Sequence, residues 1–221
     1  FTIAPYLWGS SLSGTVGTFE GVPPADVDAS FGEIFEDLDA GAMLVANANN
    51  GRFGVTVDLQ LIDLKAETDD LAPVFGTTTV DVVNRVGTLT LEYNVSASDR
   101  HEVWLAAGAR YWSVESDLSL AAGTNPAVAL SGDDSWTDPV IGVRGAADLN
   151  ERFYLTGWAY GGGFGVGSDS MGDIFAGAGY RFTPVTKGVL GYRWLSVDRA
   201  TDDFLYDVTQ RGFMLGLSFT F

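Results

Sequence analysis

The chain lacks cysteine and carries a single histidine, His101, and these two shortages exclude several kinds of chemistry. Without cysteine the protein can form neither disulfides nor thiolate sites, and one imidazole cannot serve a site that needs two. Basic residues are also few, since 12 Lys and Arg stand against 29 Asp and Glu and leave a net charge of -17. So acidic a surface repels phosphate backbones, which excludes nucleic acid as a partner.

Long apolar runs are missing too. No segment reaches 18 consecutive apolar residues, so membrane-spanning helices are excluded. The sequence contains instead short segments in which apolar and polar residues alternate. At the C-terminus Phe213, Leu215, Leu217 and Phe219 take odd positions, and small or polar residues take most of the even ones. A strand with this period has one apolar face and one wetter face.

Ten such strands can be read along the chain, and they pair into five hairpins. Their short connections lie at residues 48–51, 98–101, 149–152 and 183–187, and the longer ones lie near residues 17–38, 66–79, 117–134, 167–172 and 199–204. Short turns at one end and long loops at the other are typical of outer-membrane barrels. We therefore predict one domain over residues 1–221, an all-β, ten-stranded antiparallel up-and-down transmembrane β-barrel with short periplasmic turns and longer acidic extracellular loops.

The two predicted ends of the barrel differ in charge. A base lies at or beside each short turn (Arg52, Arg100, Arg152 and Lys187), whereas the long loops are acidic. The chain also opens at Phe1 in strand-like sequence without a methionine, as it would after removal of a signal peptide. We expect export through the periplasm to the bacterial outer membrane, with outer-membrane lipids and lipopolysaccharide as neighbours. A shortened soluble protein is the alternative.

Several motifs carry a resemblance over nearly the whole chain. They are Pro5-Tyr6-Leu7-Trp8, Leu12-Ser13-Gly14-Thr15-Val16-Gly17, Gly108-Ala109-Arg110-Tyr111-Trp112, Asp138-Pro139-Val140-Ile141-Gly142, Gly162-Gly163-Phe164-Gly165-Val166-Gly167-Ser168-Asp169 and Gly191-Tyr192-Arg193-Trp194. Taken in order, they resemble a widespread family of proteobacterial outer-membrane β-barrel proteins of poorly defined function. The terminal Phe221 is similar to the terminal phenylalanine signal of such barrels. The resemblance implies the barrel and its membrane, and it brings no catalytic residues.

Charged residues on the wetter faces indicate a polar lumen. An arginine that faced lipid at mid-bilayer would cost about 2–4 kcal/mol, so we place the arginines inside. The expected lumen network consists of Asp58, Glu92, Arg110, Arg144, Asp148, Arg181 and Arg193. Paired charges could fill and close the lumen, or they could line a thin water path and set its selectivity. The lipid-facing sides of the strands near residues 1–10 and 153–163 stay open, because aromatic residues occur on both faces.

The first long loop contains a predicted helix. Phe31, Ile34, Phe35 and Leu38 follow helical spacing, and Ser30 stands in a capping-box relation to Glu33. At the rim such a helix would be a surface for a partner. Folded inward, it would be a lid on the pore.

Two acidic clusters offer the oxygen ligands that Ca²⁺ and Mg²⁺ prefer. They are Glu67, Asp69 and Asp70, and Asp133, Asp134 and Asp138. Neither cluster has the residue order of an EF-hand, and a solvated acidic loop is the simpler explanation of both. If divalent ions bind there, we expect them to bridge to phosphates of lipopolysaccharide. Apart from such ions, no cofactor is expected.

Catalytic motifs are scarce. The glycines of residues 161–167 do not match a nucleotide-binding loop, no G-x-S-x-G occurs, and His101 lies in a short turn away from the long loops. We therefore expect a protein that is not an enzyme. The first hypothesis is a porin-like passage for small solutes or cations. The second is a structural or adhesive surface protein with an occluded lumen, whose loops bind divalent cations or lipopolysaccharide. The weakest is an outer-membrane enzyme. A homo-oligomer is possible on this sequence.

Overall fold

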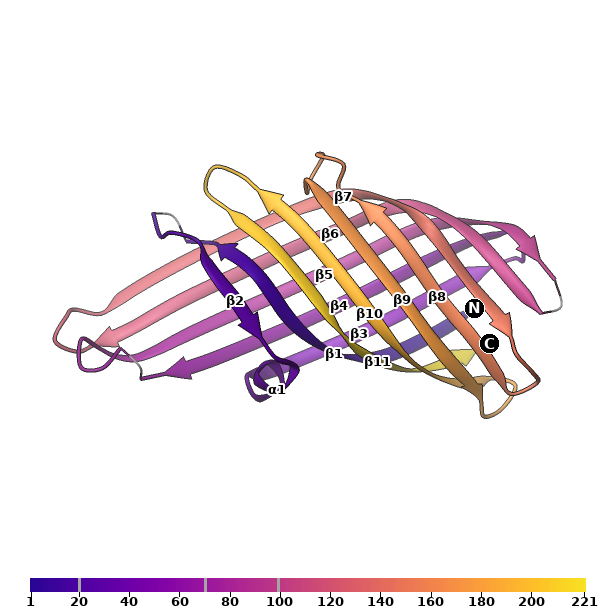
Figure 1. The fold of residues 1–221 in the computed structure, drawn as a ribbon, viewed down its shortest axis with the longest axis horizontal. Helices are drawn as coiled ribbons and strands as arrows, with labels where there is room; N and C mark the ends of the chain where they lie inside the picture. The colour runs from indigo at the N-terminus through magenta and orange to yellow at the C-terminus, as the bar shows by residue number, and fades with distance from the viewer. Residues whose placement is uncertain (20, 70, 99) are drawn as a thin grey trace.

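A closed antiparallel barrel accounts for almost all of the chain (Figure 1). The computed structural model describes residues 1–19, 21–69, 71–98 and 100–221. Within them, ten strands form the ring: β1 (Thr2–Gly17), β3 (Leu38–Asn49), β4 (Phe53–Thr68), β5 (Phe75–Ala97), β6 (His101–Ala122), β7 (Val128–Asp148), β8 (Phe153–Gly162), β9 (Ser170–Arg181), β10 (Thr186–Ala200) and β11 (Leu205–Thr220). Pairing of β1 with β11 closes the sheet. The predicted ten-stranded barrel is confirmed.

A short insertion interrupts the wall between β1 and β3. It consists of the strand β2 (Ala25–Ala29) and the helix α1 (Phe31–Glu36). The ladder from β1 to β3 covers only residues 2–5 of β1, whereas residues 12–16 of β1 pair with β2 instead. The wall is thus thinnest in backbone hydrogen bonds between these two ladders. In the described part of the chain, no helix is long and apolar enough to cross a membrane.

The lower half of the barrel, next to the short turns, presents an apolar band outward. Leu89, Leu91, Leu105, Ile141, Leu190, Phe213 and Leu215 are exposed on it. Aromatic pairs mark its two borders, with Phe53 beside Tyr93 and Phe153 beside Tyr180 near the turns, and Tyr192 beside Phe213 at the other border. Closure of the ring through β11 and β1 pairs the strands in this band, apart from the gap between β1 and β3, because hydrocarbon offers backbone groups no other partner.

The strand faces that the sequence left open are now assigned. In β1, Tyr6 and Trp8 are buried inside the barrel, and Leu7, 72% exposed, faces outward. In β8, Tyr154 is buried inside, whereas Phe153 and Leu155 face outward. The aromatic residues on the two faces therefore have different surroundings: one set packs in the lumen, and the other faces the membrane.

Polarity inverts along the strands. In the lower half of β6, Leu105 faces outward and Arg110 inward; further along the same strand, Glu115 faces outward and Val114 is buried inside. Strands β10 and β11 do the same, with Asp198 and Asp207 outward beside an apolar interior. The upper half is therefore a water-soluble barrel with an apolar core, continuous with a membrane barrel whose interior is polar.

Two predicted loops are mostly strand. Residues 66–79 and 117–134 were expected to be connections, but β4 and β5 reach Thr68 and Phe75, and β6 and β7 reach Ala122 and Val128. Figure 1 shows these hairpins extending past the other strands at the end opposite the termini. The sequence reading failed here because polar residues on the outward face and apolar ones on the inward face reverse the pattern used to find membrane strands.

Candidate functional site

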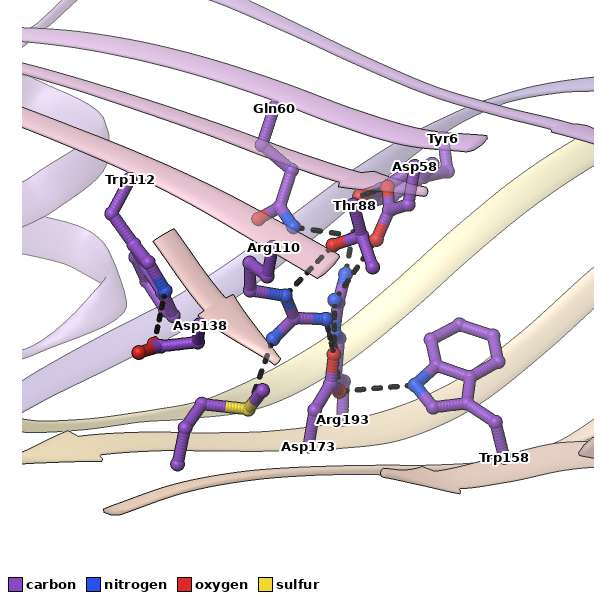
Figure 2. Close-up of polar contacts among 11 residues, drawn as sticks. Tyr6, Asp58, Gln60, Thr88, Arg110, Trp112, Asp138, Trp158, Asp173 and Arg193 are labelled. Carbon is purple, nitrogen blue, oxygen red and sulfur yellow. Dashed lines mark hydrogen bonds and ion pairs between the residues drawn. The ribbon is translucent and has the colours of Figure 1, made fainter. Parts of the chain in front are cut away.

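The centre of the lumen holds a fully buried ion cluster. Nε and Nη2 of Arg193 bind the two carboxylate oxygens of Asp173 at 3.0 and 2.7 Å, and Nη2 also lies 3.0 Å from Asp58. Nη2 of Arg110 donates to Asp173 at 2.6 Å. Figure 2 shows these side chains converging from opposite walls. Two guanidiniums and two carboxylates balance one another, which is the condition for burying charge at tolerable cost.

Neutral groups complete the cluster. Indole Nε1 of Trp158 donates to Asp173 at 3.0 Å, and the hydroxyl of Tyr6 donates to Asp58 at 2.6 Å (Figure 2). The guanidinium of Arg193 lies between the rings of Trp8 and Trp158, at 4.9 and 5.3 Å from their centroids. Arg193 and Asp173 are 0% exposed. The cross-section is thus filled by side chains that hold one another in place.

Above the ion cluster the lumen is packed with apolar side chains. Trp112 and Trp136 stack at 5.7 Å, and Phe204 and Tyr206 contact Trp136 edge-on. Val114, Val140, Leu195, Val197 and Val208 belong to the same buried cluster. Packing of this kind is that of a protein interior rather than of a water path.

The outer mouth is covered by the chain that follows β1. A Cβ at Gly132 of β7 would collide with the carbonyl oxygen of Thr18, and Thr18 is buried. The missing side chain of Gly132 therefore lets residues 18 and 19 cross the mouth in contact with the far wall. The lumen is closed twice on this side, by the apolar core and by this crossing segment.

The turn end, in contrast, is hollow. A cavity of about 540 Å³ reaches from Tyr6 and Trp158 to the short turns. Two ion pairs lie in its wall: Arg144 with Glu92, through hydrogen bonds of 3.0 and 2.7 Å, and Arg181 with Asp148. Both arginines remain partly accessible, at 20% and 25% exposure of the side chain. Water and small solutes can thus enter from the turn end as far as the ion cluster.

All seven lumen residues predicted from the sequence face the interior, but they form three groups. Asp58, Arg110 and Arg193 join the central cluster, Glu92 binds Arg144, and Asp148 binds Arg181. The sequence reading missed Asp173, which bridges both central arginines. Asp173 shares one alternating face of β9 with Phe175 and Arg181, and this alternation is the signal that could have indicated it.

The second acidic cluster is not a loop site, and the prediction that grouped it was wrong about Asp138. That carboxylate is 0% exposed inside β7, where it accepts hydrogen bonds from Trp112 and from the backbone and hydroxyl of Ser168 (Figure 2 shows the first of these). Asp133 and Asp134 alternate to opposite faces, and Asp134 binds Arg199 at 2.7 Å. These three carboxylates therefore cannot converge on one ion.

The first acidic cluster is described only in part. Glu67 lies 3.8 Å from Lys65 in a surface ion pair, Asp69 lies just after β4, and Asp70 lies outside the described residues. Over the residues that the structure describes, no three His, Asp or Glu side chains are grouped so that they could hold a metal ion. Binding of Ca²⁺ or Mg²⁺ stays a prediction without an assigned site.

The predicted helix exists, but it does not form a lid. The hydroxyl of Ser30 and the carboxylate of Glu33 form the expected capping box, and hydrogen bonds from the side chain and backbone of Ser30 lower the pKa of Glu33. The ring of Phe31 packs on the outward face of Gly9, where a Cβ would meet it at 2.9 Å. Phe31 and Phe35 are exposed and Ile34 is half-buried, whereas Leu38 begins β3, opposite Leu64. The helix therefore lies on the outside of the wall, against the gap between β1 and β3.

Carboxylates also gather outside the upper rim of β9–β11. Burial raises the pKa of Asp198, and the carboxylates of Asp207 and Asp169 raise it further. Asp198 lies directly opposite Asp207 in the β10–β11 ladder. Like charges facing each other across strands destabilise a sheet, so this rim is strained at neutral pH.

His101 forms a small polar cluster at the turn end. Its Nδ1 lies 2.7 Å from the hydroxyl of Ser98, which also accepts hydrogen bonds from the backbone N–H groups of Arg100 and His101. The serine is thus engaged in shaping the turn. Both residues are exposed at the turn end, where they line the mouth of the cavity, away from the long hairpins.

The fold is that of an outer-membrane β-barrel, because the ring is closed, its outside carries an apolar band and its lower lumen is polar. Among solved structures, the outer membrane protease OmpT from Escherichia coli aligns with the whole chain and 96% of its own, at a TM-score of 0.62 and 12% identity. Neisserial surface protein A and the CymD monoaromatic hydrocarbon channel also align along the whole chain and cover 97% and 87% of their own, but with TM-scores of 0.36 and 0.37 at 11% and 10% identity. The likeness to OmpT is one of fold. No protein-family model and no curated protein matches the sequence.

Proposed function

We propose that this chain is an occluded barrel of the bacterial outer membrane, a structural or adhesive surface protein rather than an open porin. The observation that carries the proposal is the apolar core of the upper half, with Trp112 and Trp136 stacked across the lumen. A water path would have to pass through this core, the crossing segment at Gly132 and the central ion cluster. With the short turns in the periplasm, the long hairpins reach the cell exterior.

The outward face of β4–β7 beyond the membrane is the surface that such a protein would use. It carries six carboxylates, Asp63, Glu67, Asp81, Glu115, Asp117 and Asp133, and two cations, Lys65 opposite Asp81 and Arg85 in an ion pair with Glu115. Asp81 faces Asp117, and Glu115 faces Asp133, across neighbouring strands. Like charges in register favour association with cations or with a basic partner, and divalent cations would link this face to lipopolysaccharide phosphates.

Recording in planar lipid bilayers tests the occlusion. The folded wild-type protein should give no conductance steps, because its lumen lacks a continuous aqueous path. A double variant, Trp112→Ala with Trp136→Ala, hollows only the upper core and leaves the crossing segment and the central ion cluster in place, so it too should give no steps. Regular cation-selective steps from the wild type would overturn the proposal.

Porin-like passage remains the second candidate, because the lower lumen is hollow and charged. If the wild type conducts, Asp58→Lys or Glu92→Lys should weaken or reverse its cation selectivity. Enzymatic activity has less support, since the one histidine is engaged at a turn, and the expectation that the chain is not an enzyme stays a prediction.

The surface role has its own test. The folded protein should co-sediment with lipopolysaccharide aggregates in about 5 mM Ca²⁺. This concentration exceeds the dissociation constants of weak extracellular calcium sites, which are about 10⁻⁴–10⁻³ M. Asp81→Asn with Asp117→Asn should reduce this binding, whereas Asp202→Asn with Asp203→Asn, in the loop after β10, serves as a control of equal charge. Equal binding by both variants would contradict an assignment to this face.

A further inference from the structure

The turn-end cavity differs in charge from the rest of the molecule. Besides His101, its lining contains four basic side chains and two acidic ones, and a third carboxylate, Glu92, lies behind it in the ion pair with Arg144, in a chain whose net charge is -17. The basic residues are Arg100, Arg144, Arg181 and Lys187, and the acidic ones are Glu102 and Asp148. Clefts with low-dielectric walls focus such a field. The cavity is therefore suited to an anion, although the protein as a whole repels anions.

The basic groups lie at two depths. Arg181 and Lys187 are paired in the β9–β10 ladder next to the short turn, at the mouth of the cavity. Arg144 lies deeper, opposite Trp158 in the β7–β8 ladder. Within the described residues, Arg144 uses Nε and Nη2 for Glu92, while Nη1 lies 3.9 Å from Glu102 and makes no hydrogen bond. Nη1, in a long ion pair with Glu102, can thus donate to a ligand in the deeper part of the cavity.

Uncharged polar groups make up much of the remaining lining. They are eight hydroxyl and amide side chains, among them Asn47, Asn49 and Thr156. The apolar part consists of aliphatic side chains such as Val45, Val189 and Leu217, of Met214, and of rings that include Tyr154, Trp158 and Phe175. Hydroxyls and amides both donate and accept hydrogen bonds, as a polyhydroxylated ligand requires. Aromatic rings provide flat surface for the C–H face of a sugar ring. A volume of about 540 Å³ lies within the range of small-molecule pockets.

We propose that this cavity is a binding site for a carboxylated sugar of about disaccharide size, which enters from the turn end. Its carboxylate would engage the arginines and Lys187, and its hydroxyls would engage the neutral lining. The ion cluster and the apolar core close the other end, so the ligand exchanges on one side of the membrane only. The orientation with turns in the periplasm rests on the proposed function above, and it makes the source a periplasmic solute or glycan end.

Calorimetric titration of the detergent-folded protein with digalacturonate tests the site. Binding should be detected for digalacturonate, whereas lactose, a neutral disaccharide, should bind at least tenfold more weakly. Lys187→Gln, at a half-buried position, and Arg100→Gln, at an exposed one, should each raise the dissociation constant about two- to fivefold. Lys65→Gln, which removes a lysine on the opposite end of the barrel, should leave it unchanged.

Three outcomes overturn the proposal. Absence of digalacturonate binding removes the site, and equal binding of lactose removes the role of the basic residues. If acetate at the same carboxylate concentration displaces digalacturonate completely, the cavity recognises charge alone and not a sugar. The measurement is made on solubilised protein, so it does not depend on conductance or orientation, and failure of the occluded-barrel proposal would leave it unaffected.

Discussion

The hydroxyl of Tyr6 on β1 donates a 2.6 Å hydrogen bond to Asp58 on β4, across the intervening strand β3. Nη1 of Arg193 reaches the same hydroxyl at 3.1 Å from β10. Tyr6 lies just beyond the last residue of β1 that pairs with β3. The side-chain bridge therefore joins the wall where the backbone ladder is shortest.

Replacement of Tyr6 by phenylalanine should weaken this joint. Asp58 and Arg193 would each lose a buried partner, so we expect a loss of about 1–3 kcal/mol in the free energy of unfolding. Reversible urea unfolding in lipid vesicles measures it. Tyr192→Phe, on the membrane-facing side, is the matched control and should change stability by about 0.5 kcal/mol or less. Equal effects of the two substitutions would contradict a specific role for Tyr6.

Asp173 should be the most sensitive carboxylate in the lumen. Asp173→Asn leaves Arg110 and Arg193 with less than full compensation in a buried site, and removing one partner of such a group costs about 3–5 kcal/mol. Asp148→Asn removes the partner of the partly exposed Arg181 at the cavity mouth and should cost about 0–1 kcal/mol. The same unfolding assay compares them. Similar losses would mean that the central cluster is hydrated.

Gly132 should control the cover of the outer mouth. In Gly132→Ala the new methyl group meets the carbonyl of Thr18, so residues 18 and 19 must move away. Chymotrypsin should then cleave the folded protein after Phe19 faster than in the wild type. Gly87→Ala, whose methyl group would lie 3.6 Å from Leu59, is the control, and equal cleavage of both variants would show that the segment does not depend on this contact.

The inversion of polarity along β6 predicts opposite tolerances on one face of one strand. Ala107 and Ser119 both face outward, the first in the apolar band and the second beyond it. Ala107→Arg should cost about 2–4 kcal/mol in lipid vesicles. Ser119→Arg should stay within about 0.5 kcal/mol of the wild type, and a large loss there would place the membrane border higher than we infer.

Asp198 predicts a dependence of stability on pH. Its raised pKa means that folding is penalised while the carboxylate is charged, and the penalty disappears as the pH falls through the raised pKa toward the unfolded value of about 3.9. Asp198→Asn should therefore be more stable than the wild type at pH 7, and this advantage should vanish near pH 3. Asp202→Asn, in the loop after β10, provides the control. A variant that is less stable at pH 7 would contradict the argument.

The membrane half of the fold was predictable because its rule is simple. Arginine side chains are costly in hydrocarbon, and this rule alone assigned the inward faces of β6, β7, β9 and β10 correctly. The upper half was not predictable by the same rule, because Asp117 and Ser119 outward with Leu118 and Leu120 inward have the pattern of a soluble strand. That reversal made residues 117–134 look like a loop and placed Asp138 among exposed carboxylates.

Which inward charged side chains form ion pairs could not be predicted from the sequence, for a geometric reason. Asp58 and Arg193 lie 135 residues apart, and the stagger of the closed ring decides which inward positions share a level. Alternation indicates only that a residue points inward. The helix α1 shows the same limit, since its spacing and cap were readable from Ser30 to Phe35, but its place on Gly9 depends on where the β1–β3 ladder ends.

The outward carboxylates of the β4–β5 and β6–β7 hairpins make insertion into the membrane costly. These outward carboxylates, from Asp63 to Asp133, must traverse the hydrocarbon to reach the far side, although among the described residues no membrane segment of the finished barrel exposes such groups there. Even if the barrel closed before insertion, these carboxylates would still have to cross the lipid bilayer. Insertion is therefore expected to need a catalyst or a protonated intermediate, and the finished molecule would be trapped in its orientation by the same barrier.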